Sequence, residues 1–231
     1  MRRCIAAILA AVALAPTARS ADDNAPRVLR YSFPAAETGF DPAQINDLYS
    51  RTVTSHVFDG LYDYDPLARP YRVRPNVALG MPEVSEDFKV WTVRIKPGIY
   101  FADDPAFGGK KRELVAQDFV YSWKRFFDPA LKSPVYSGFK EAGVIGVEAL
   151  RQRAIQNKTP FDYDTEVEGI RALDRYTLQF KLDSPRPRLI YTLAAGDRGN
   201  VADRMSEERT ENQLGPFIDG LLRRLLRSLR G

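Results

Sequence analysis

Apolar and polar residues follow two different periods in the middle of the chain. Residues 90–95 alternate with a period of two, which predicts a strand, and residues 99–101 predict a second short strand after the turn at Pro97-Gly98. A helical spacing of three and four then appears at Phe119, Val120, Trp123, Phe126 and Phe127. We expect four aromatic residues of these patterns in the core: Trp91, Phe119, Trp123 and Phe126.

The residues before this region predict one strand, one helix and one long connection. Residues 28–33 alternate and predict a strand. Asp41 can cap a helix whose first position suits Pro42, and an apolar stripe continues that helix through Ile45, Leu48, Val53 and Val57. Residues 66–82 are rich in Pro and Arg and are typical of a connecting loop.

The residues after it predict a helix, a hairpin and a further helix. Residues 133–136 open a short element, and residues 147–156 predict a helix. Residues 167–182 predict a β-hairpin with its turn at Asp174-Arg175, and a last helix begins at Leu189.

The first twenty residues have the pattern of a secretory signal. Arg2 and Arg3 precede an apolar run over residues 5–15, and small residues allow cleavage before Ala21. The run is shorter than the roughly 20 residues that cross a bilayer, although an uncleaved anchor is the alternative. Cleavage removes Cys4, the one cysteine, so the mature chain would lack disulfides, cysteine nucleophiles and thiolate metal sites.

The charge is not distributed like that of a nucleic-acid-binding protein. The whole chain carries a net charge of +4, but residues 21–197 hold 24 Lys and Arg against 25 Asp and Glu. This nearly neutral body has no basic stripe, so we expect no nucleic-acid partner.

Candidate catalytic residues are few. His56 is the one histidine and cannot build a multi-histidine site, so a surface or packing role is favoured. The pair Asp103-Asp104 and the residues Asp162 and Asp164 could ligate a hard cation, but Asp beside Pro or Gly is more typical of turns. No glycine-rich phosphate loop occurs. We therefore expect no enzyme, no cofactor and no metal.

Two segments carry a resemblance to a known family. The sequence DFKVWTVRIKPGIYF at 87–101 and QDFVYSWKRFFDP at 117–129 resemble the extracellular solute-binding proteins, family 5, of peptide-importing ABC transporters. The resemblance covers residues 28–197. It implies an α/β fold of the periplasmic-binding-protein type II class, in its peptide-binding branch.

The resemblance also implies that the fold is truncated to first-lobe and accessory-domain segments. It divides the chain as follows. Residues 1–20 would be the signal peptide, residues 21–58 the start of the first lobe, and residues 59–196 the accessory domain. Residues 197–231 form an atypical tail rich in Arg and Leu. This tail could be a basic membrane-surface helix, a helix covering apolar surface, or the product of a frameshift.

The function implied is that of a periplasmic component that captures an oligopeptide by lobe closure and delivers it to an inner-membrane permease. We expect a monomer. The alternatives are a truncated or repurposed fragment that no longer binds peptide, and a binder of nickel, haem or a sugar.

The resemblance points to five ligand-binding residues. Glu37, Thr38 and Phe40 lie in a loop that should border the cleft. Asn46 stands at a ligand-contacting position where an acidic residue would be expected, and Tyr136 matches a tyrosine near the peptide. The acidic partner of a peptide's amino terminus belongs to a second lobe, so no residue here is assigned to it.

Overall fold

The structure is a computed structural model that describes residues 32–194 of the chain. The strands are β1 (Tyr62–Tyr64), β2 (Val73–Pro75), β3 (Glu83–Val84), β4 (Val90–Arg94), β5 (Ile170–Asp174) and β6 (Thr177–Lys181). The helices are α2 (Leu48–Thr54), the 3-10 helix η1 (Pro105–Phe107), α3 (Ala116–Arg125), α4 (Tyr136–Glu141), α5 (Val147–Asn157) and α6 (Leu189–Ala194). None of these helices is long and apolar enough to cross a membrane.

The main sheet is four-stranded and antiparallel, with the order β3-β4-β6-β5. Apolar and polar residues alternate along its strands because one face of the sheet is buried and the other is polar. The buried face carries Trp91, Val93, Leu178 and Phe180. On the other face, the Gln179 amide donates a hydrogen bond to the Thr92 hydroxyl across the β4–β6 pair.

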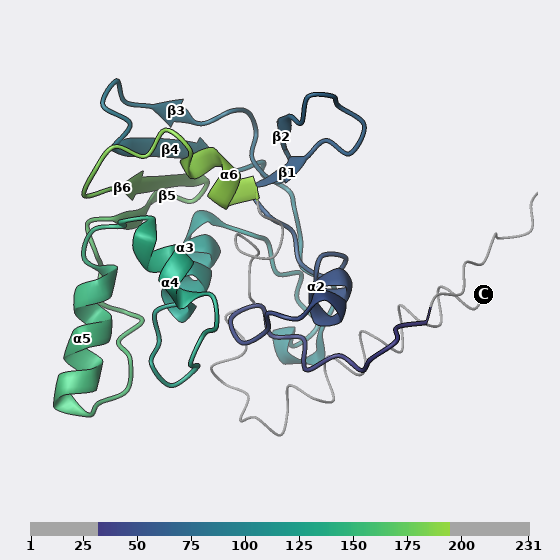
Figure 1. Cartoon of the computed structure of the whole chain (residues 1–231), viewed down its shortest axis with the longest axis horizontal. Coiled ribbons are helices and arrows are strands. Elements are labelled where there is room, and N and C mark those ends of the chain that lie inside the picture. Colours follow the sequence, from purple (N-terminus) through teal and green to yellow (C-terminus); the bar gives the residue numbers. More distant parts are fainter. Residues whose placement is uncertain (1–31, 195–231) are drawn as a thin grey trace, which may run out of the picture. The chain divides into compact units, whose positions relative to one another are not determined.

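Helices α3 and α4 lie on the buried side of this sheet (Figure 1). The Trp123 ring of α3 contacts Phe180 of the sheet and Phe139 of α4, with ring centroids 4.8 and 4.9 Å apart. Phe126 stacks on Phe139 at 3.9 Å. Aromatic pairs of this kind contribute about 0.5–1.5 kcal/mol beyond the area that they bury, so this cluster fixes α3 against the sheet.

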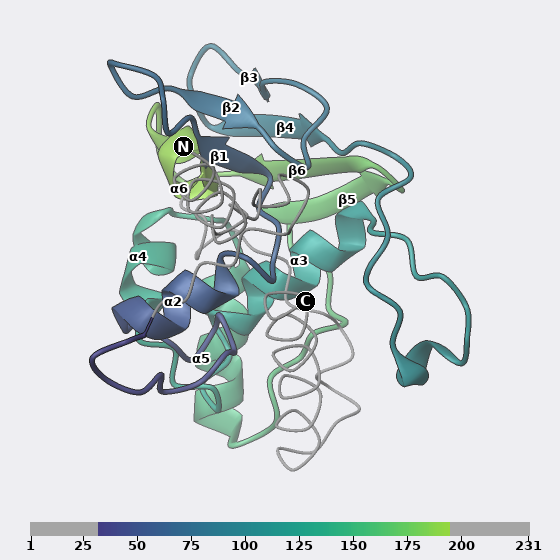
Figure 2. The same cartoon turned by 90° about the vertical axis from the view of Figure 1, so that its right-hand side faces the viewer.

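A small second sheet stands beside the first. Strands β1 and β2 pair antiparallel, and α6 packs against both (Figure 2). The Tyr64 and Tyr191 rings stack with centroids 6.3 Å apart. After the main sheet, the chain thus returns through α6 to strands β1 and β2.

Most of the predicted elements are confirmed. The strand over 90–94, the helix α3, the helix α5 and the hairpin β5–β6 form where the residue patterns place them. The four aromatic residues expected in the core are at most 3% exposed. The predicted strand over residues 28–33 falls mostly outside the described residues, and the predicted signal peptide (1–20) and tail (197–231) lie wholly outside them.

Three local predictions are wrong. The segment over 66–82 contains strand β2, because residues 73–75 find β1 as a partner. Residues 99–101 form no regular strand and make only one isolated bridge, between Tyr100 and Glu113. The hairpin turn holds Arg175 and Tyr176, since Asp174 pairs with Thr177 and accepts a hydrogen bond from the Tyr176 N–H at 2.8 Å.

The first helix also begins later than predicted. It starts at Leu48 and is capped by Asp47, which accepts the Ser50 N–H at 2.8 Å. Asp41 instead closes a turn, because its carbonyl accepts the N–H groups of Gln44 and Ile45. Its carboxylate accepts the Ala43 N–H at 3.0 Å and so caps this turn, but no helix continues from it.

Two side-chain interpretations are confirmed as well. His56 is exposed at the end of α2, where its Nδ1 atom lies 2.7 Å from the Thr52 carbonyl oxygen. Asp103 and Asp104 precede η1 in a turn, in which Phe107 N–H donates to the Asp104 carbonyl. No group of three His, Cys, Asp or Glu side chains within residues 32–194 could hold a metal ion.

Gly169 should be irreplaceable for a steric reason. A Cβ atom there would lie 2.2 Å from the backbone N and O atoms of Ile145, which pair with the β5–β6 hairpin. We expect Gly169→Ala to lower the free energy of unfolding by about 2 kcal/mol or more, as overpacking does. Gly80→Ala is the matched control, since its Cβ would meet nothing within 4 Å. Urea unfolding of both variants measures this, and equal stabilities would contradict the close approach.

Candidate ligand-binding site

A buried ion pair connects the N-terminal segment to helix α3. The Arg125 guanidinium donates to both carboxylate oxygens of Asp41, at 3.1 and 2.7 Å. The two side chains expose only 6% and 14% of their surfaces. Bidentate geometry makes this the strongest class of charge-assisted contact, and it joins residues that are 84 positions apart.

The environment of Arg125 keeps it charged. Burial by itself lowers its pKa, but the charge and hydrogen bonds of Asp41 outweigh this and raise the pKa above its ordinary value. Next to it, the Tyr163 hydroxyl donates to Asp128 at 2.6 Å, and the Tyr163 ring lies 4.9 Å from that of Tyr121. Tyr121 and Tyr163 also raise the pKa of Arg125 electrostatically, so both lie near the ion pair.

The predicted cleft loop is held by the start of α2. Thr38 N–H donates to the Ser50 hydroxyl at 2.9 Å, and the Thr38 hydroxyl donates to Asp47. The hydrogen bonds from Ser50 and Thr38 lower the pKa of Asp47 below its ordinary value of 3.8. The Asp47 carboxylate thus caps α2 and also binds Thr38, so the loop that contains Thr38 is held against the start of the helix.

Asn46 lines an open cavity together with residues from the other half of the described chain. The cavity has a volume of about 190 Å³ and is lined by Asn46, Pro134, Val135, Ser137, Gly138 and Glu141. We call it the Asn46 cavity. It forms where the loop before α2 meets the start of α4. Its lining combines one amide, one hydroxyl and one carboxylate with small apolar groups, which suits the polar main chain of a ligand.

Tyr136 lies next to this cavity but is not part of its lining. Its hydroxyl donates to Glu148 at 2.6 Å, and Arg151 stacks on its ring at 4.1 Å. Burial, followed by the hydrogen bond to Glu148, raises the pKa of this hydroxyl. The tyrosine therefore fixes α4 to α5, and its neighbours Val135 and Ser137 contact the cavity.

The other three predicted residues lie together on the loop before α2. Glu37 and Thr38 are exposed, and Phe40 is half-buried. None of them lines the Asn46 cavity. Sequence reasoning missed Val135, Ser137, Gly138 and Glu141 as lining residues. Of these, Gly138 and Glu141 are three positions apart on one face of α4, which is the one signal that helical spacing could have given.

Comparison with known proteins now identifies the family. The family described as bacterial extracellular solute-binding proteins, family 5 Middle, matches residues 72–216. The chain belongs to this family. This match includes both segments on which the resemblance in the sequence rested.

The curated relatives are named as peptide-binding proteins. The chain is 29% identical over 147 residues to the periplasmic oligopeptide-binding protein OppA of Escherichia coli, covering 64% of this chain and 23% of the relative. It is 30% identical over 184 residues to the oligopeptide-binding protein AmiA of Streptococcus pneumoniae, covering 78% of this chain and 25% of the relative. The chain thus spans about a quarter of the length of these relatives.

Solved structures agree on the fold. The Escherichia coli murein tripeptide binding protein MppA is 28% identical with a TM-score of 0.58, over 77% of this chain and 31% of that chain. Haemophilus influenzae OppA, solved with the peptide RPPGFSPFR, has a TM-score of 0.61 over 78% of this chain and 31% of that chain. The latter is 22% identical, so it supports the fold alone.

The Asp41–Arg125 pair should dominate the stability of this region. Asp41→Asn leaves Arg125 buried without a compensating charge, which costs about 3–5 kcal/mol of unfolding free energy. Glu83→Gln is the matched control, because it breaks the exposed pair with Arg94 and should cost less than about 1 kcal/mol. Urea unfolding compares the two variants. A similar loss of unfolding free energy in both would show that the buried pair contributes no more to stability than the exposed pair.

The loop anchored by Asp47 should respond to acid. The pKa of Asp47 is lowered in the folded chain, so the ionised carboxylate stabilises the fold above about pH 4. This stabilisation is lost as the pH falls further, toward the pKa of Asp47 in the folded chain. Stability measured from pH 7 to pH 2 should therefore fall more steeply for the wild type than for Asp47→Asn, which cannot titrate. Parallel pH profiles would contradict the anchoring role.

Proposed function

We propose that the chain is the peptide-binding component of an ABC importer. Its family consists of extracellular solute-binding proteins, and its curated relatives are named for oligopeptides, di- and tripeptides and murein peptide. Binding rather than catalysis is the activity. The relatives OppA and MppA are named as periplasmic, and we assign the same location to this chain.

The Asn46 cavity is the observation that carries this proposal. It places an amide from the N-terminal segment beside Ser137 and the turn at Pro134-Val135. Peptides whose side chains vary are recognised chiefly through their main-chain groups, and a polar, open wall can supply such contacts. In this proposal Glu37, Thr38 and Phe40 of the preceding loop also contact the peptide. Tyr136 holds α4 in place through its contacts with Glu148 and Arg151.

In this proposal the described residues form one wall of the peptide site. A second lobe would supply the opposite wall, close on the ligand by a hinge and present the closed form to a membrane permease. The chain spans about a quarter of the length of its relatives. One wall makes fewer contacts with a ligand than a closed cleft does, so residues 32–194 by themselves should bind peptide more weakly than a protein with both walls.

Thermal unfolding of the purified chain with and without mixed di- to pentapeptides tests this function. A ligand that binds only the folded state raises the midpoint of unfolding. Asn46→Ala should weaken peptide binding about fivefold, the value of one hydrogen bond. Gln44→Ala is the matched control, because Gln44 is exposed in the same segment and does not line the cavity.

The outcomes separate the alternatives. A midpoint raised by peptides and restored toward the ligand-free value by Asn46→Ala supports the proposal. A cooperative transition that no peptide shifts contradicts it and favours a fragment without peptide binding. A shift caused by nickel, haem or a sugar instead of peptides would assign another solute.

A further inference from the structure

The Asn46 cavity holds a single charge. Of the residues within 32–194 that line it, Glu141 alone is charged. Glu141 is the last residue of α4, whereas Asn46 comes from the segment before α2. A carboxylate and an amide from two separate segments therefore line one open cavity, and no Lys or Arg of the described chain lines it with them.

The polar side chains of this cavity are not used by the fold. Within the described part of the chain, the side chains of Asn46, Ser137 and Glu141 make no hydrogen bond and no ion pair. All three residues are exposed. The neighbouring carboxylates do have partners, since Asp47 accepts the first N–H groups of α2 and Glu148 accepts a tyrosine hydroxyl. The three cavity groups are therefore left for a ligand or for water.

The basic side chains of the neighbouring segments lie outside the lining. The Lys140 ammonium is directed toward α5, because it lies 3.7 Å from a carboxylate oxygen of Glu148 and over the ring of Tyr136. Arg151 lies over the same ring, 4.1 Å from its centroid. Lys132 is exposed in the turn before α4 and does not line the cavity. The cavity carboxylate thus has no compensating cation in its own lining.

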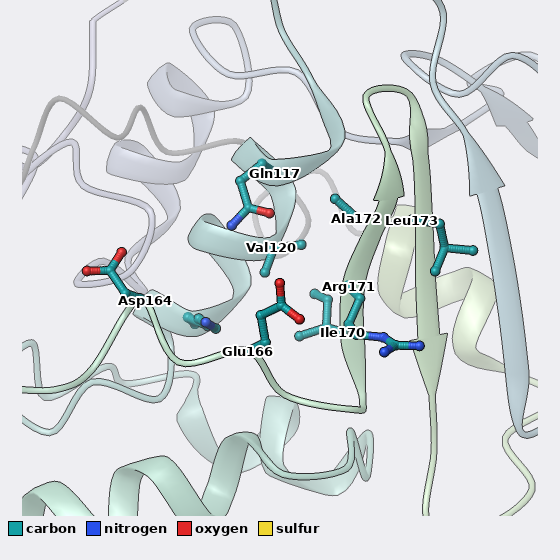
Figure 3. Close-up of a pocket in the computed structure, with 9 residues that line it drawn as sticks. Gln117, Val120, Asp164, Glu166, Ile170, Arg171, Ala172 and Leu173 are labelled. Carbon is teal, nitrogen blue, oxygen red and sulfur yellow. The ribbon is translucent and has the colours of Figure 1, made fainter.

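Another cavity shows the contrast. It has a volume of about 220 Å³ and lies between α3 and strand β5. Its lining holds the carboxylates of Asp164 and Glu166 (Figure 3). Lys124 and Arg171 belong to the same lining. Burial lowers the pKa of Lys124, and the charges of Asp164 and Glu166 act against this shift. Charges of both signs from the chain itself balance there, whereas the charge in the Asn46 cavity is unbalanced.

We infer that the Asn46 cavity selects peptides that present a cationic group to Glu141. This inference rests on the proposed peptide-binding function and adds a selectivity to it. The cation is the amino terminus of the peptide or a Lys or Arg side chain, because each offers several charged N–H donors to a carboxylate. The side-chain oxygens of Asn46 and Ser137 accept further N–H groups of the ligand beside it.

Calorimetry with four tripeptides tests this selectivity. All have alanine at both ends and an amidated carboxyl end, the middle residue is lysine or norleucine, and the amino end is free or acetylated. Each is titrated into the purified chain. Glu141→Gln keeps the size of the side chain, removes its charge and should weaken the probes that carry the recognised cation about fivefold. The acetylated norleucine probe has no cation and should bind both forms equally.

Glu86→Gln is the matched control. Glu86 is exposed after strand β3 and does not line the cavity, so this variant makes the same change in net charge and should bind every probe as the wild type does. The unfolding midpoint of Glu141→Gln without peptide should equal that of the wild type, because Glu141 has no partner to lose in the described chain. If the variant is unfolded, added salt replaces it, and it should weaken only the cationic probes on the wild type.

The pattern of losses identifies the cation. A loss confined to the lysine probes assigns the side chain, and a loss confined to the probes with a free amino end assigns the amino terminus. Equal binding of all probes to the wild type and to Glu141→Gln overturns the inference, as does an equal loss that includes the acetylated norleucine probe. The peptide-binding function survives either result if Asn46→Ala still weakens the probes. If no probe binds the wild type, both proposals fail.

Discussion

The buried ion pair between Asp41 and Arg125 is the contact on which the position of the N-terminal segment depends. Desolvating a guanidinium is costly unless a carboxylate meets it in good geometry, and here both oxygens are used. The pair thereby determines where the turn at 41–45 ends. The helix that follows begins at Leu48, and Thr38 of the loop before it binds Asp47 and Ser50.

This constraint explains which parts of the fold were predictable from the sequence. Strand β4, helix α3 and the hairpin β5–β6 have one face that must be buried, so their periodicity alone defines them. The start of α2 was not predictable in this way. Asp41-Pro42 is a good local helix start, and the Asp41 carboxylate does cap a turn by accepting the Ala43 N–H. The same carboxylate also binds Arg125, 84 positions away, and the helix begins only after a second cap at Asp47. No local pattern reveals that long-range contact.

The same distinction applies to the candidate site. The resemblance led to Asn46 and to the residues around 133–136, and the structure brings these two segments to one cavity. It could not tell which side chain of the second segment faces the cavity, because that depends on how α4 is rotated. The rotation is set by Tyr136, which is held by Glu148 and Arg151 of α5. Val135 and Ser137 consequently line the cavity.

Helix α3 holds two segments that lie far apart in the sequence. Successive helical residues point about 100° apart, so the neighbours Lys124 and Arg125 reach different segments. Arg125 holds the turn before α2, and Lys124 holds the loop over 163–165 beside β5. The aromatic cluster around Trp123 fixes the rotation of the helix about its axis. Each segment is therefore held by its own buried, positively charged side chain of one helix.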